Sequence, residues 1–193
     1  MLSLFLSSAS VACGDNSINM KIAISGPMGS GKSTIANIIR NSDERYNIYS
    51  FGQKVKDVAY DLFNMNKNFK DRSLLINIAD NMRMIDPDVW AKYIIKQIDD
   101  HKYCIIDDLR FQNELDILDK DSEWIYIILH IDNNKRLERL KKLYPDNYDD
   151  HVKNMTHLSE KGGLQFSNHS RTLHLNSGDS LENIKYNIEY FIN

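Results

Sequence analysis

The octapeptide GPMGSGKS at residues 26–33 constrains the fold more than any other stretch of this chain. It follows the apolar, β-prone run at 21–25, and the isoleucines of 35–39 repeat behind it at helical spacing. The pattern Gly-x-x-x-x-Gly-Lys-Ser in this position fits a strand, a turn and a helix, with backbone N–H groups of the turn surrounding phosphate oxygens. We therefore predict a phosphate-binding loop here, and a chance glycine-rich turn is the disfavoured alternative.

Within this phosphate loop, residues 26–33, Lys32 is expected to reach the β and γ phosphates of ATP, and Ser33 to offer its hydroxyl to Mg²⁺. The residues expected to contact the nucleotide belong to the loop and the first helical turn: Gly26, Met28, Gly29, Ser30, Gly31, Lys32, Ser33 and Thr34.

Composition narrows the class of partner. The 193 residues suffice for one domain, and a net charge of -3 argues against a nucleic-acid polymer, whose phosphates require a strongly basic face. No run is long enough to span a membrane as a helix, so no membrane partner is expected. Cys104 lies in an apolar run and is expected in the core, which favours a reducing, cytoplasmic compartment. A small-molecule partner is therefore expected, and a homodimer stays possible.

The first nineteen residues resemble the apolar core of a signal peptide, but no Lys or Arg precedes that core. Secretion would also separate an ATP-dependent protein from its nucleotide. We therefore expect residues 1–19 to be a disordered extension and residues 20–193 to form one P-loop domain. A targeting segment is the alternative.

Apolar strands alternate with amphipathic helices along the rest of the chain. This order predicts an α/β fold with a parallel sheet and helices on both faces. Residues 124–131 are apolar at nearly every position, as a strand buried on both faces should be. Besides the strand before the loop, strands are expected at 47–51, 103–106, 124–131 and 172–175, and helices at 52–63, 72–83, 87–94, 110–118 and 179–191.

Residues 133–163 differ in character, with many charges, one proline and several Asn and Asp residues. We interpret them as a mobile lid. Arg136 and Arg139 stand one helical turn apart in it, and cations on a mobile segment suit closure over transferring phosphates. A solvated charged helix face is the alternative for either arginine.

Two adjacent carboxylates, Asp107 and Asp108, end the predicted third strand. Ligands bind at the carboxyl ends of such strands, and an Asp beside a phosphate loop is the usual second contact to Mg²⁺. A helix N-cap is the alternative, and with two carboxylates one could cap while the other faces the metal. The six histidines show no compact spacing typical of a zinc site.

Arginines supply the candidate phosphate ligands. Arg110 follows the two aspartates, and Glu114 at i+4 could hold its guanidinium in position, with a weak surface ion pair as the alternative. Arg72 and Arg83 share a helix face but lie roughly 16 Å apart along the axis, so one phosphate cannot easily be shared between them. One could hold the acceptor phosphate while the other holds a more distant group.

Several motifs resemble one known family in order: FGQKVK at 51–56, RSLLINIADNMR and DPDVWAK at 72–92, IIDDLRFQNE at 105–114, His-Leu-Ser-Glu at 157–160 and Asn-Ser-Gly at 176–178. That family is the deoxynucleoside monophosphate kinases of phages and large DNA viruses, within the P-loop nucleotide kinase group. The chain departs from it at Leu158, where the family has proline, and in a longer, more charged segment before His157. This departure leaves open which lid arginine is catalytic.

With five strands expected in the parallel sheet, the resemblance implies the three-layer form of an α/β P-loop kinase fold. It further implies transfer of the γ-phosphoryl group of MgATP to a nucleoside monophosphate, in deoxynucleotide metabolism and in the host cytoplasm if the protein is viral. The implied catalytic residues are Lys32, Arg110, Arg136 and Arg139, and Asn176 would lie near the adenine. Substrate binding is implied for Phe51, Lys56, Arg72, Arg83, Trp90, Arg110, Phe111 and Glu114. The implied metal contacts are Ser33, Asp107 and Asp108.

Two alternatives remain open. Another small-molecule kinase, such as a phosphomevalonate kinase, would share the loop, the Asp-x-Arg pattern and the lid without a need to stack a base. A non-catalytic ATP-binding module would keep Lys32 and could dispense with Arg110 and Arg136. The base and the sugar of a nucleotide acceptor are not specified by these motifs.

Overall fold

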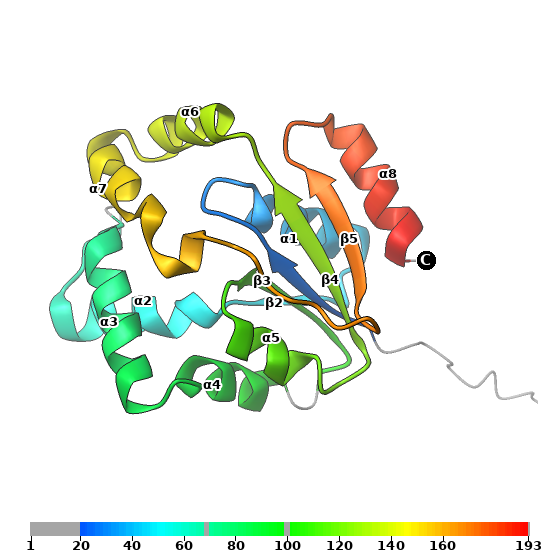
Figure 1. Cartoon of the computed structure of the whole chain (residues 1–193), viewed down its shortest axis with the longest axis horizontal. Coiled ribbons are helices and arrows are strands. Elements are labelled where there is room, and N and C mark those ends of the chain that lie inside the picture. The colour runs from blue at the N-terminus through cyan, green and yellow to red at the C-terminus, as the bar shows by residue number, and fades with distance from the viewer. Residues whose placement is uncertain (1–19, 68–69, 99–100, 193) are drawn as a thin grey trace, which may run out of the picture.

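A single parallel sheet organises the described part of the chain, residues 20–67, 70–98 and 101–192 of this computed structural model (Figure 1). Its five strands run in the order β2-β3-β1-β4-β5, which confirms the expected fold class. The predicted extension at 1–19 lies outside the described residues. The strand bounds are β1 Met20–Ser25, β2 Asn47–Tyr49, β3 Tyr103–Leu109, β4 Trp124–His130 and β5 Arg171–Asn176.

Helices fill the connections between these strands. The α-helices are α1 Lys32–Ser42, α2 Phe51–Phe63, α3 Arg72–Ile85, α4 Val89–Ile98, α5 Gln112–Leu118, α6 Asn133–Leu143, α7 Tyr148–Lys153 and α8 Leu181–Ile192. Three short 3-10 turns are η1 Pro145–Asn147, η2 Asn154–Thr156 and η3 Leu158–Glu160. No helix among these has the length and hydropathy needed to cross a bilayer.

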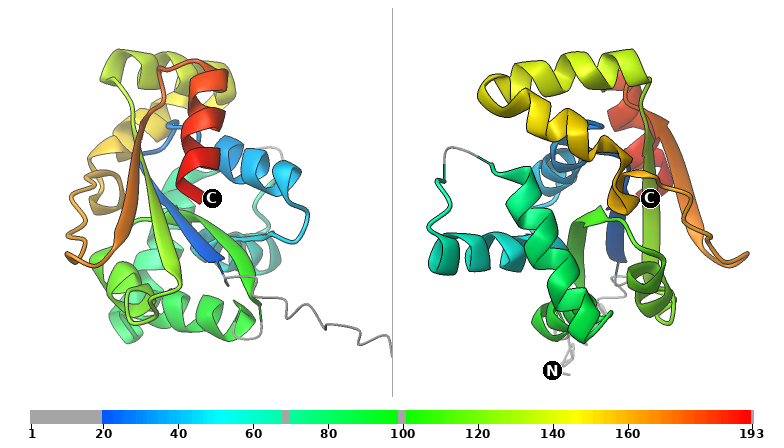
Figure 2. Two further views of the ribbon diagram at one scale, coloured as in Figure 1. Left: turned by 90° about the vertical axis from the view of Figure 1, so that its right-hand side faces the viewer. Right: turned by 60° about the vertical axis from the view of Figure 1, so that its left-hand side comes forward.

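Side-chain alternation along the central strand β1 divides the core into two layers. Ile22 and Ile24 point to one face, where they pack with the apolar stripes of α1 and α8. Ala23 points to the opposite face, toward α2, α4 and α5. Figure 2 shows α1 and α8 together on one side of the sheet. The strands are therefore buried on both faces, as their continuous apolar runs predict.

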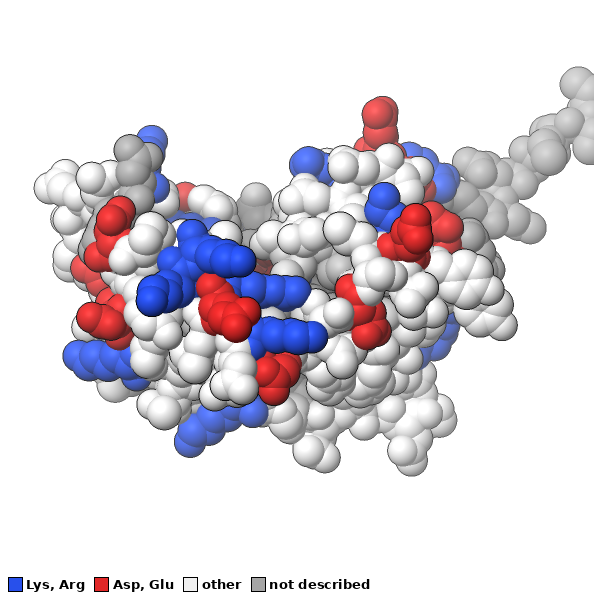
Figure 3. Space-filling view, turned by 90° about the horizontal axis from the view of Figure 1, so that it is seen from above, with Lys and Arg blue, Asp and Glu red and all other residues white. Residues whose placement is uncertain are grey.

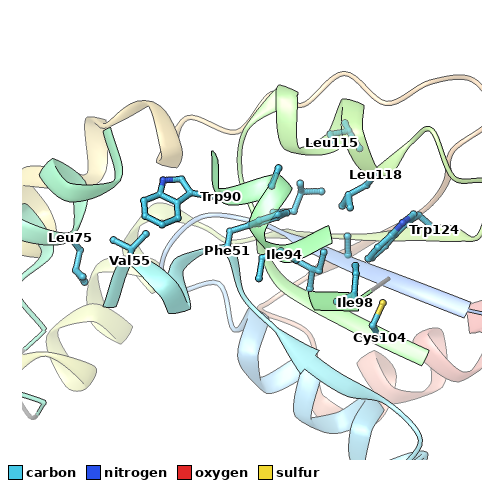
Figure 4. Packing of buried hydrophobic residues seen from close by; sticks show 14 of the residues in the cluster. Phe51, Val55, Leu75, Trp90, Ile94, Ile98, Cys104, Leu115, Leu118 and Trp124 are labelled. Carbon is cyan, nitrogen blue, oxygen red and sulfur yellow. The ribbon is translucent and has the colours of Figure 1, made fainter. Parts of the chain in front are cut away.

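The second layer carries most of the bulky apolar side chains. Figure 4 shows Phe51 and Val55 of α2 near Trp90 and Ile94 of α4. Cys104 is fully buried there, as expected, and burial raises the pKa of its thiol to about 12. This layer fixes the start of α2 against the carboxyl end of β3, where the candidate site lies.

The lid segment, residues 133–163, is more regular than its polar composition suggests. It forms α6, α7 and all three 3-10 turns, and α7 packs beside α3 (Figure 1). His151 of α7 is fully buried and stacks on Tyr144, with ring centroids 3.9 Å apart. Whether the lid segment moves during a reaction stays a prediction.

Candidate active site

A cavity of about 840 Å³ opens at the carboxyl ends of the strands. Its wall is built by the phosphate loop, α2, α3, the segment between β3 and α5, and the lid segment. In parallel sheets this edge is the usual ligand site, because strand order changes direction there and the loops leave a crevice. Here β1 pairs with β3 on one side and with β4 on the other, so the phosphate loop lies at the centre.

Glycines let the phosphate loop follow a path that other residues would block. At Gly26, with φ 149°, a Cβ atom would lie 2.8 Å from Ser30 Oγ and 2.9 Å from the carbonyl oxygen of Leu129. Gly31 has φ 94° and precedes the first residue of α1. A left-handed conformation at this position strongly favours glycine. The N-terminus of α1 consequently faces the cavity, with its free N–H groups available to an anion.

Lys32 lies inside the curve of this loop. Its Nζ atom donates to the carbonyl oxygens of Gly26 at 2.7 Å and Pro27 at 2.9 Å. Burial, with a contribution from the charge of Arg110, lowers the pKa of Lys32 well below its usual value. An anion placed in the loop would reverse this shift, since it would stabilise the ammonium form.

Ser33 and Asp107 form a pair at the floor of the cavity. Ser33 Oγ donates to Asp107 Oδ2 at 2.7 Å. Burial, and then the charge of Asp108, raises the pKa of Asp107, so a cation beside it would be favourable. Across residues 20–67, 70–98 and 101–192 there is no cluster of three or more His, Cys, Asp or Glu side chains suited to a metal ion. Mg²⁺ fits this pair nevertheless, because it usually keeps several waters and binds substrate phosphates.

Asp108 takes the capping role that the sequence left open as the alternative to a metal contact. Its carboxylate accepts hydrogen bonds from Ser50 Oγ at 2.7 Å and from the backbone N–H groups of Phe51 and Gly52 at 2.8 Å each. Those groups belong to the N-terminus of α2, so Asp108 caps that helix from a neighbouring strand. The geometry therefore supports Asp107 as the metal contact and does not support Asp108.

Glu160 gathers three arginines that are distant in sequence. Its Oε1 atom pairs with Arg72 Nη2 at 2.8 Å and with Arg110 Nη1, and its Oε2 atom pairs with Arg136 Nη2 at 2.6 Å. The same Oε2 accepts the backbone N–H of Met28 at 2.7 Å. The Glu160 side chain has no exposed area. We call these three arginines the arginine cluster.

The expected pairing of Arg110 with Glu114 is wrong. Glu114 accepts the backbone N–H groups of Arg110 and Phe111 at 3.0 Å each, which caps the start of α5, and it lies 3.5 Å from Arg83 Nη2. Burial, with the charge of Asp108, raises the pKa of Glu114 to about 7. The guanidinium of Arg110 instead turns to Glu160 and to the carbonyl oxygen of Ser159, 2.9 Å away.

Arg72 and Arg83 line the cavity at opposite ends of α3, as their spacing predicts. Arg72 belongs to the arginine cluster. The guanidinium carbon of Arg83 lies over the ring of Phe111, 4.0 Å from its centroid. The cavity wall thus combines cationic side chains, Arg72 and Arg110, with a flat surface formed by Arg83 and Phe111.

The two lid arginines both contact the phosphate loop. Arg136 Nε donates to the carbonyl oxygen of Met28 at 2.9 Å. Arg139 Nη1 donates to the carbonyl oxygen of Gly29 at 3.4 Å, and its Nη2 donates to that of Ser177 at 2.5 Å. Arg139 lines the cavity, whereas Arg136 is buried behind the wall.

The expected substrate contact Trp90 and the expected adenine contact Asn176 do not line the cavity. Trp90 is buried in the core, with its indole N–H donating to the carbonyl oxygen of Ala79 at 3.2 Å, so it supports α3 from behind. Asn176 accepts the backbone N–H of Gly178 at 2.8 Å and shapes the turn after β5, while Ser177 and Asp179 line the cavity. Other expected residues do lie in the wall: Phe51, Lys56, Phe111, Glu114 and Thr34.

Lys70 and His157 have polar side chains in the cavity wall but were not among the predicted site residues. Lys70 lines the wall, and burial lowers the pKa of its ammonium to about 8, with Arg72 adding to the shift. His157 also lines the wall, and its Nε2 lies 2.9 Å from Asp80 Oδ2. Lys70 could have been selected from the sequence, because it is a cation only two residues before the candidate phosphate ligand Arg72. The contact between His157 and Asp80 spans 77 positions, and no local pattern reveals it.

Charge on the surface is mixed, as it is in the cavity wall, where Asp107 and Glu114 lie among lysines and arginines. On the face drawn in Figure 3, Lys and Arg side chains gather in one area, and Asp and Glu side chains stand among them. Helix α6 contributes exposed Lys135, Glu138, Lys141 and Lys142. Alternating signs of this kind differ from the uniform basic stripe typical of polymer-binding surfaces.

Solved structures share the fold at low sequence identity. A gluconokinase from Sinorhizobium meliloti 1021 gives a TM-score of 0.58 at 14% identity, with 91% of this chain and 92% of that chain covered. A sugar kinase from Janibacter sp. HTCC2649 gives 0.59 at 13% identity, with 90% and 94% covered. Among curated proteins, no sequence matches this chain.

A family model matches the sequence itself over residues 22–162. Its description is AAA domain, and the match spans the phosphate loop, both strand-end aspartates and nearly all of the lid segment. Together with the sheet order, this match assigns a P-loop kinase-like fold. The chain belongs to the AAA_18 family of AAA domains.

Proposed function

We propose that this protein is an ATP-dependent phosphotransferase that acts on a nucleoside monophosphate and gives the diphosphate. The observation that carries the proposal is the layout of the cavity. The phosphate loop with Lys32 lines the cavity together with Arg72, Arg110 and Arg139 and with the stacked pair of Arg83 and Phe111. These groups suit a donor triphosphate, a transferring group and an acceptor that ends in a flat base.

ATP would occupy the phosphate loop. Backbone N–H groups of residues 29–33 and the ammonium of Lys32 are the donors closest to its β and γ phosphates. Arg139, which lines the cavity between Gly29 and Ser177, adds a cation on the lid side. Ser177 and Asp179 follow β5 and are candidates for contacts with the nucleoside part.

The pair Ser33 and Asp107 would hold Mg²⁺, either directly or through water. The ion would supply charge neutralisation on the phosphate oxygens. The raised pKa of Asp107 supports this position, because its buried charge lacks a cation in contact.

The acceptor would lie along α3. Arg110 and Arg72 are suited to its phosphate, since guanidinium groups bind phosphate oxygens in a two-pronged geometry. Phe51, Leu75 and Ala79 offer an apolar wall, and the Arg83 and Phe111 stack offers a flat surface for a base. The resemblance to deoxynucleoside monophosphate kinases supports the same choice of acceptor.

The chemistry requires little beyond this arrangement. The attacking oxygen of a monophosphate is already anionic, so no strong general base is required. Catalysis would come from holding donor and acceptor in line and from neutralising charge on the transferring group. Lys32, Arg110 and Arg139 line the cavity where that charge develops.

A hydroxyl acceptor is the second candidate, because solved structures of similar fold are titled gluconokinase and sugar kinase. Such an acceptor needs a base to take its proton. The pair of His157 and Asp80 lines the cavity and offers one. The alternatives of a phosphomevalonate kinase and a non-catalytic ATP-binding module also remain.

Coupled-assay rates with a panel of acceptors test the proposal. The panel contains deoxy and ribo monophosphates, gluconate, simple sugars and phosphomevalonate, each with MgATP. We expect transfer to at least one monophosphate at a rate at least 100-fold above that with the sugars. Preferential turnover of a hydroxyl acceptor contradicts the proposal, and ATP binding without turnover of any acceptor favours the binding module.

A further inference from the structure

We propose that Glu160 is a positioning residue that assembles the arginine cluster of Arg72, Arg110 and Arg136 and fixes it to the phosphate loop. It would do so without touching the substrate itself. The inference deepens the proposed phosphoryl transfer and rests on it for its effect on turnover. The anion site that it describes has a readout that does not need turnover.

The contacts of Glu160 use its whole carboxylate. Oε1 receives Arg72 and Arg110, and Oε2 receives Arg136 and the N–H of Met28. Each oxygen thus accepts two donors. Glu160 is absent from the residues that line the cavity, whereas Arg72 and Arg110 line it. The carboxylate therefore holds these two guanidinium groups from behind and leaves their other N–H groups toward the cavity.

The three arginines come from separate elements: the start of α3, the segment after β3, and α6. Their distances from Glu160 in sequence are 88, 50 and 24 positions. Three cations brought together in a buried place repel one another, and burial lowers the pKa of both Arg72 and Arg136. One shared carboxylate offsets part of this repulsion and orders the side chains before any ligand arrives.

The net charge of the group suits phosphate. Three guanidinium groups and one carboxylate leave an excess of two positive charges, which is complementary to a phosphoryl group carrying about two negative charges. In addition, Arg72 Nε is buried without a hydrogen-bond partner. Unsatisfied buried donors are costly, so an anion oxygen that reached this N–H would be stabilised by it.

Met28 connects this group to the donor side. Its N–H donates to Glu160, and its carbonyl oxygen accepts from Arg136 Nε at 2.9 Å. The phosphate loop and the arginines on the acceptor side are therefore joined through one residue of the lid segment. A shift of Glu160 would change the separation between the two sides, and small errors in that separation are expensive for a transfer reaction.

Turnover gives the first test, with Glu160→Gln, Glu160→Asp and a control, Asp121→Asn. The control removes a carboxylate at the opposite end of the sheet, where Asp121 Oδ2 lies 2.7 Å from Lys21 Nζ. We expect Glu160→Gln to lower kcat by about 10²-fold with the KM for ATP changed less than threefold, because the cations remain but lose their alignment. Glu160→Asp should recover part of kcat, and Asp121→Asn should leave it unchanged. Equal kcat in Glu160→Gln and wild type overturns the inference.

Binding of tripolyphosphate gives the second test and requires no turnover. In calorimetry, Arg72→Met and Arg136→Met should act non-additively on its affinity, by about tenfold, because both arginines are ordered by one carboxylate. In a Glu160→Gln background the two effects should become additive. Additive effects in the wild-type background overturn the inference even if Glu160→Gln fails to fold.

The two proposals fail separately. Non-additive binding in a protein that transfers no phosphoryl group contradicts the proposed function and supports the anion site. Normal transfer with additive binding and normal kcat in Glu160→Gln contradicts only the role of Glu160.

Discussion

Buried lysines show how the cavity is prepared for an anion at the level of single residues. Burial lowers the pKa of both Lys32 and Lys70, so each ammonium lies where its charged form is disfavoured without a partner. Perturbed groups of this kind gather at functional sites. A bound polyphosphate would restore the charged form of both lysines. Two predictions follow from this change in charge between the free and the anion-bound protein.

Lys32→Ala should lower turnover by about 10² to 10³ while the fold stays intact, because it removes a cation from the transferring phosphates. The melting temperature should change little, since the lost ammonium is disfavoured by burial in the folded state. Steady-state rates and thermal melting measure both effects. Near wild-type turnover in a folded variant contradicts the assignment of the phosphate loop.

Anion binding at pH 8 should be accompanied by proton uptake at Lys70. Its pKa of about 8 leaves much of it neutral at this pH, and a bound polyphosphate raises that pKa. Calorimetry with tripolyphosphate in buffers of different ionisation enthalpy measures the uptake, and affinity should weaken as the pH rises through 8. Lys70→Arg is the control, because its charge does not titrate there and the uptake should fall by the share that belongs to Lys70. Equal uptake in both proteins assigns it to another group.

Adjacent aspartates show how one strand serves two purposes at the level of helices and strands. Successive residues of β3 point to opposite sides, so Asp107 reaches Ser33 of α1 while Asp108 reaches the start of α2. The strand therefore places one carboxylate at the candidate metal site and uses the other to fix a helix. Substitution of Asp107 should therefore change the magnesium requirement, whereas substitution of Asp108 should change the stability of the fold.

Asp108→Ala should reduce the free energy of unfolding by about 1 to 2 kcal/mol, as expected for loss of a helix cap, and should leave the magnesium requirement within threefold. Asp107→Asn should raise the magnesium concentration needed for half-maximal activity at least tenfold. It should not lower stability, because burial raises the pKa of Asp107 and its charge is unfavourable in the fold. Denaturant unfolding and magnesium titrations measure both. A reversal of the two outcomes would exchange the roles of the aspartates.

Helices and strands with a clear hydrophobic period could be predicted from the sequence, whereas the hydrogen-bond and ion-pair partners of several site residues could not. The strands of the parallel sheet and the helices of the second core layer follow from local apolar spacing, and the phosphate loop follows from its Gly-x-x-x-x-Gly-Lys-Ser pattern. The partner of Asp108 lies 57 positions away, and Glu160 joins Arg72 across 88. No local pattern records such pairs. The i+4 spacing indicates Glu114 as a partner for the Arg110 guanidinium, because such local relations are visible in a sequence, whereas the folded chain brings the more distant Glu160 to it.

The lid segment ties the two halves of the chain together. Asp150 of α7 accepts the backbone N–H groups of Arg72 at 2.8 Å and Ser73 at 3.2 Å, so it caps the start of α3 from another helix. Asn147 donates to the carbonyl oxygen of Lys70 at 2.6 Å. These contacts join the lid to the wall of the acceptor site. The position of the lid and that of Arg72 are therefore expected to change together.

Asp150→Ala should loosen this connection without unfolding the sheet. Although burial opposes it, hydrogen bonds from Ser73 and the backbone lower the pKa of Asp150, so its contribution is present at neutral pH and is lost as the solution becomes strongly acidic. In hydrogen exchange at neutral pH, we expect faster exchange in residues 133–163 and at the start of α3, with β1 and β4 unchanged. The KM values for ATP and for the acceptor should rise several-fold. Asp149→Ala, at the exposed neighbouring position, is the matched control and should change neither quantity. If exchange rises equally in the strands, Asp150 supports the whole fold, and the lid segment is not a separate unit.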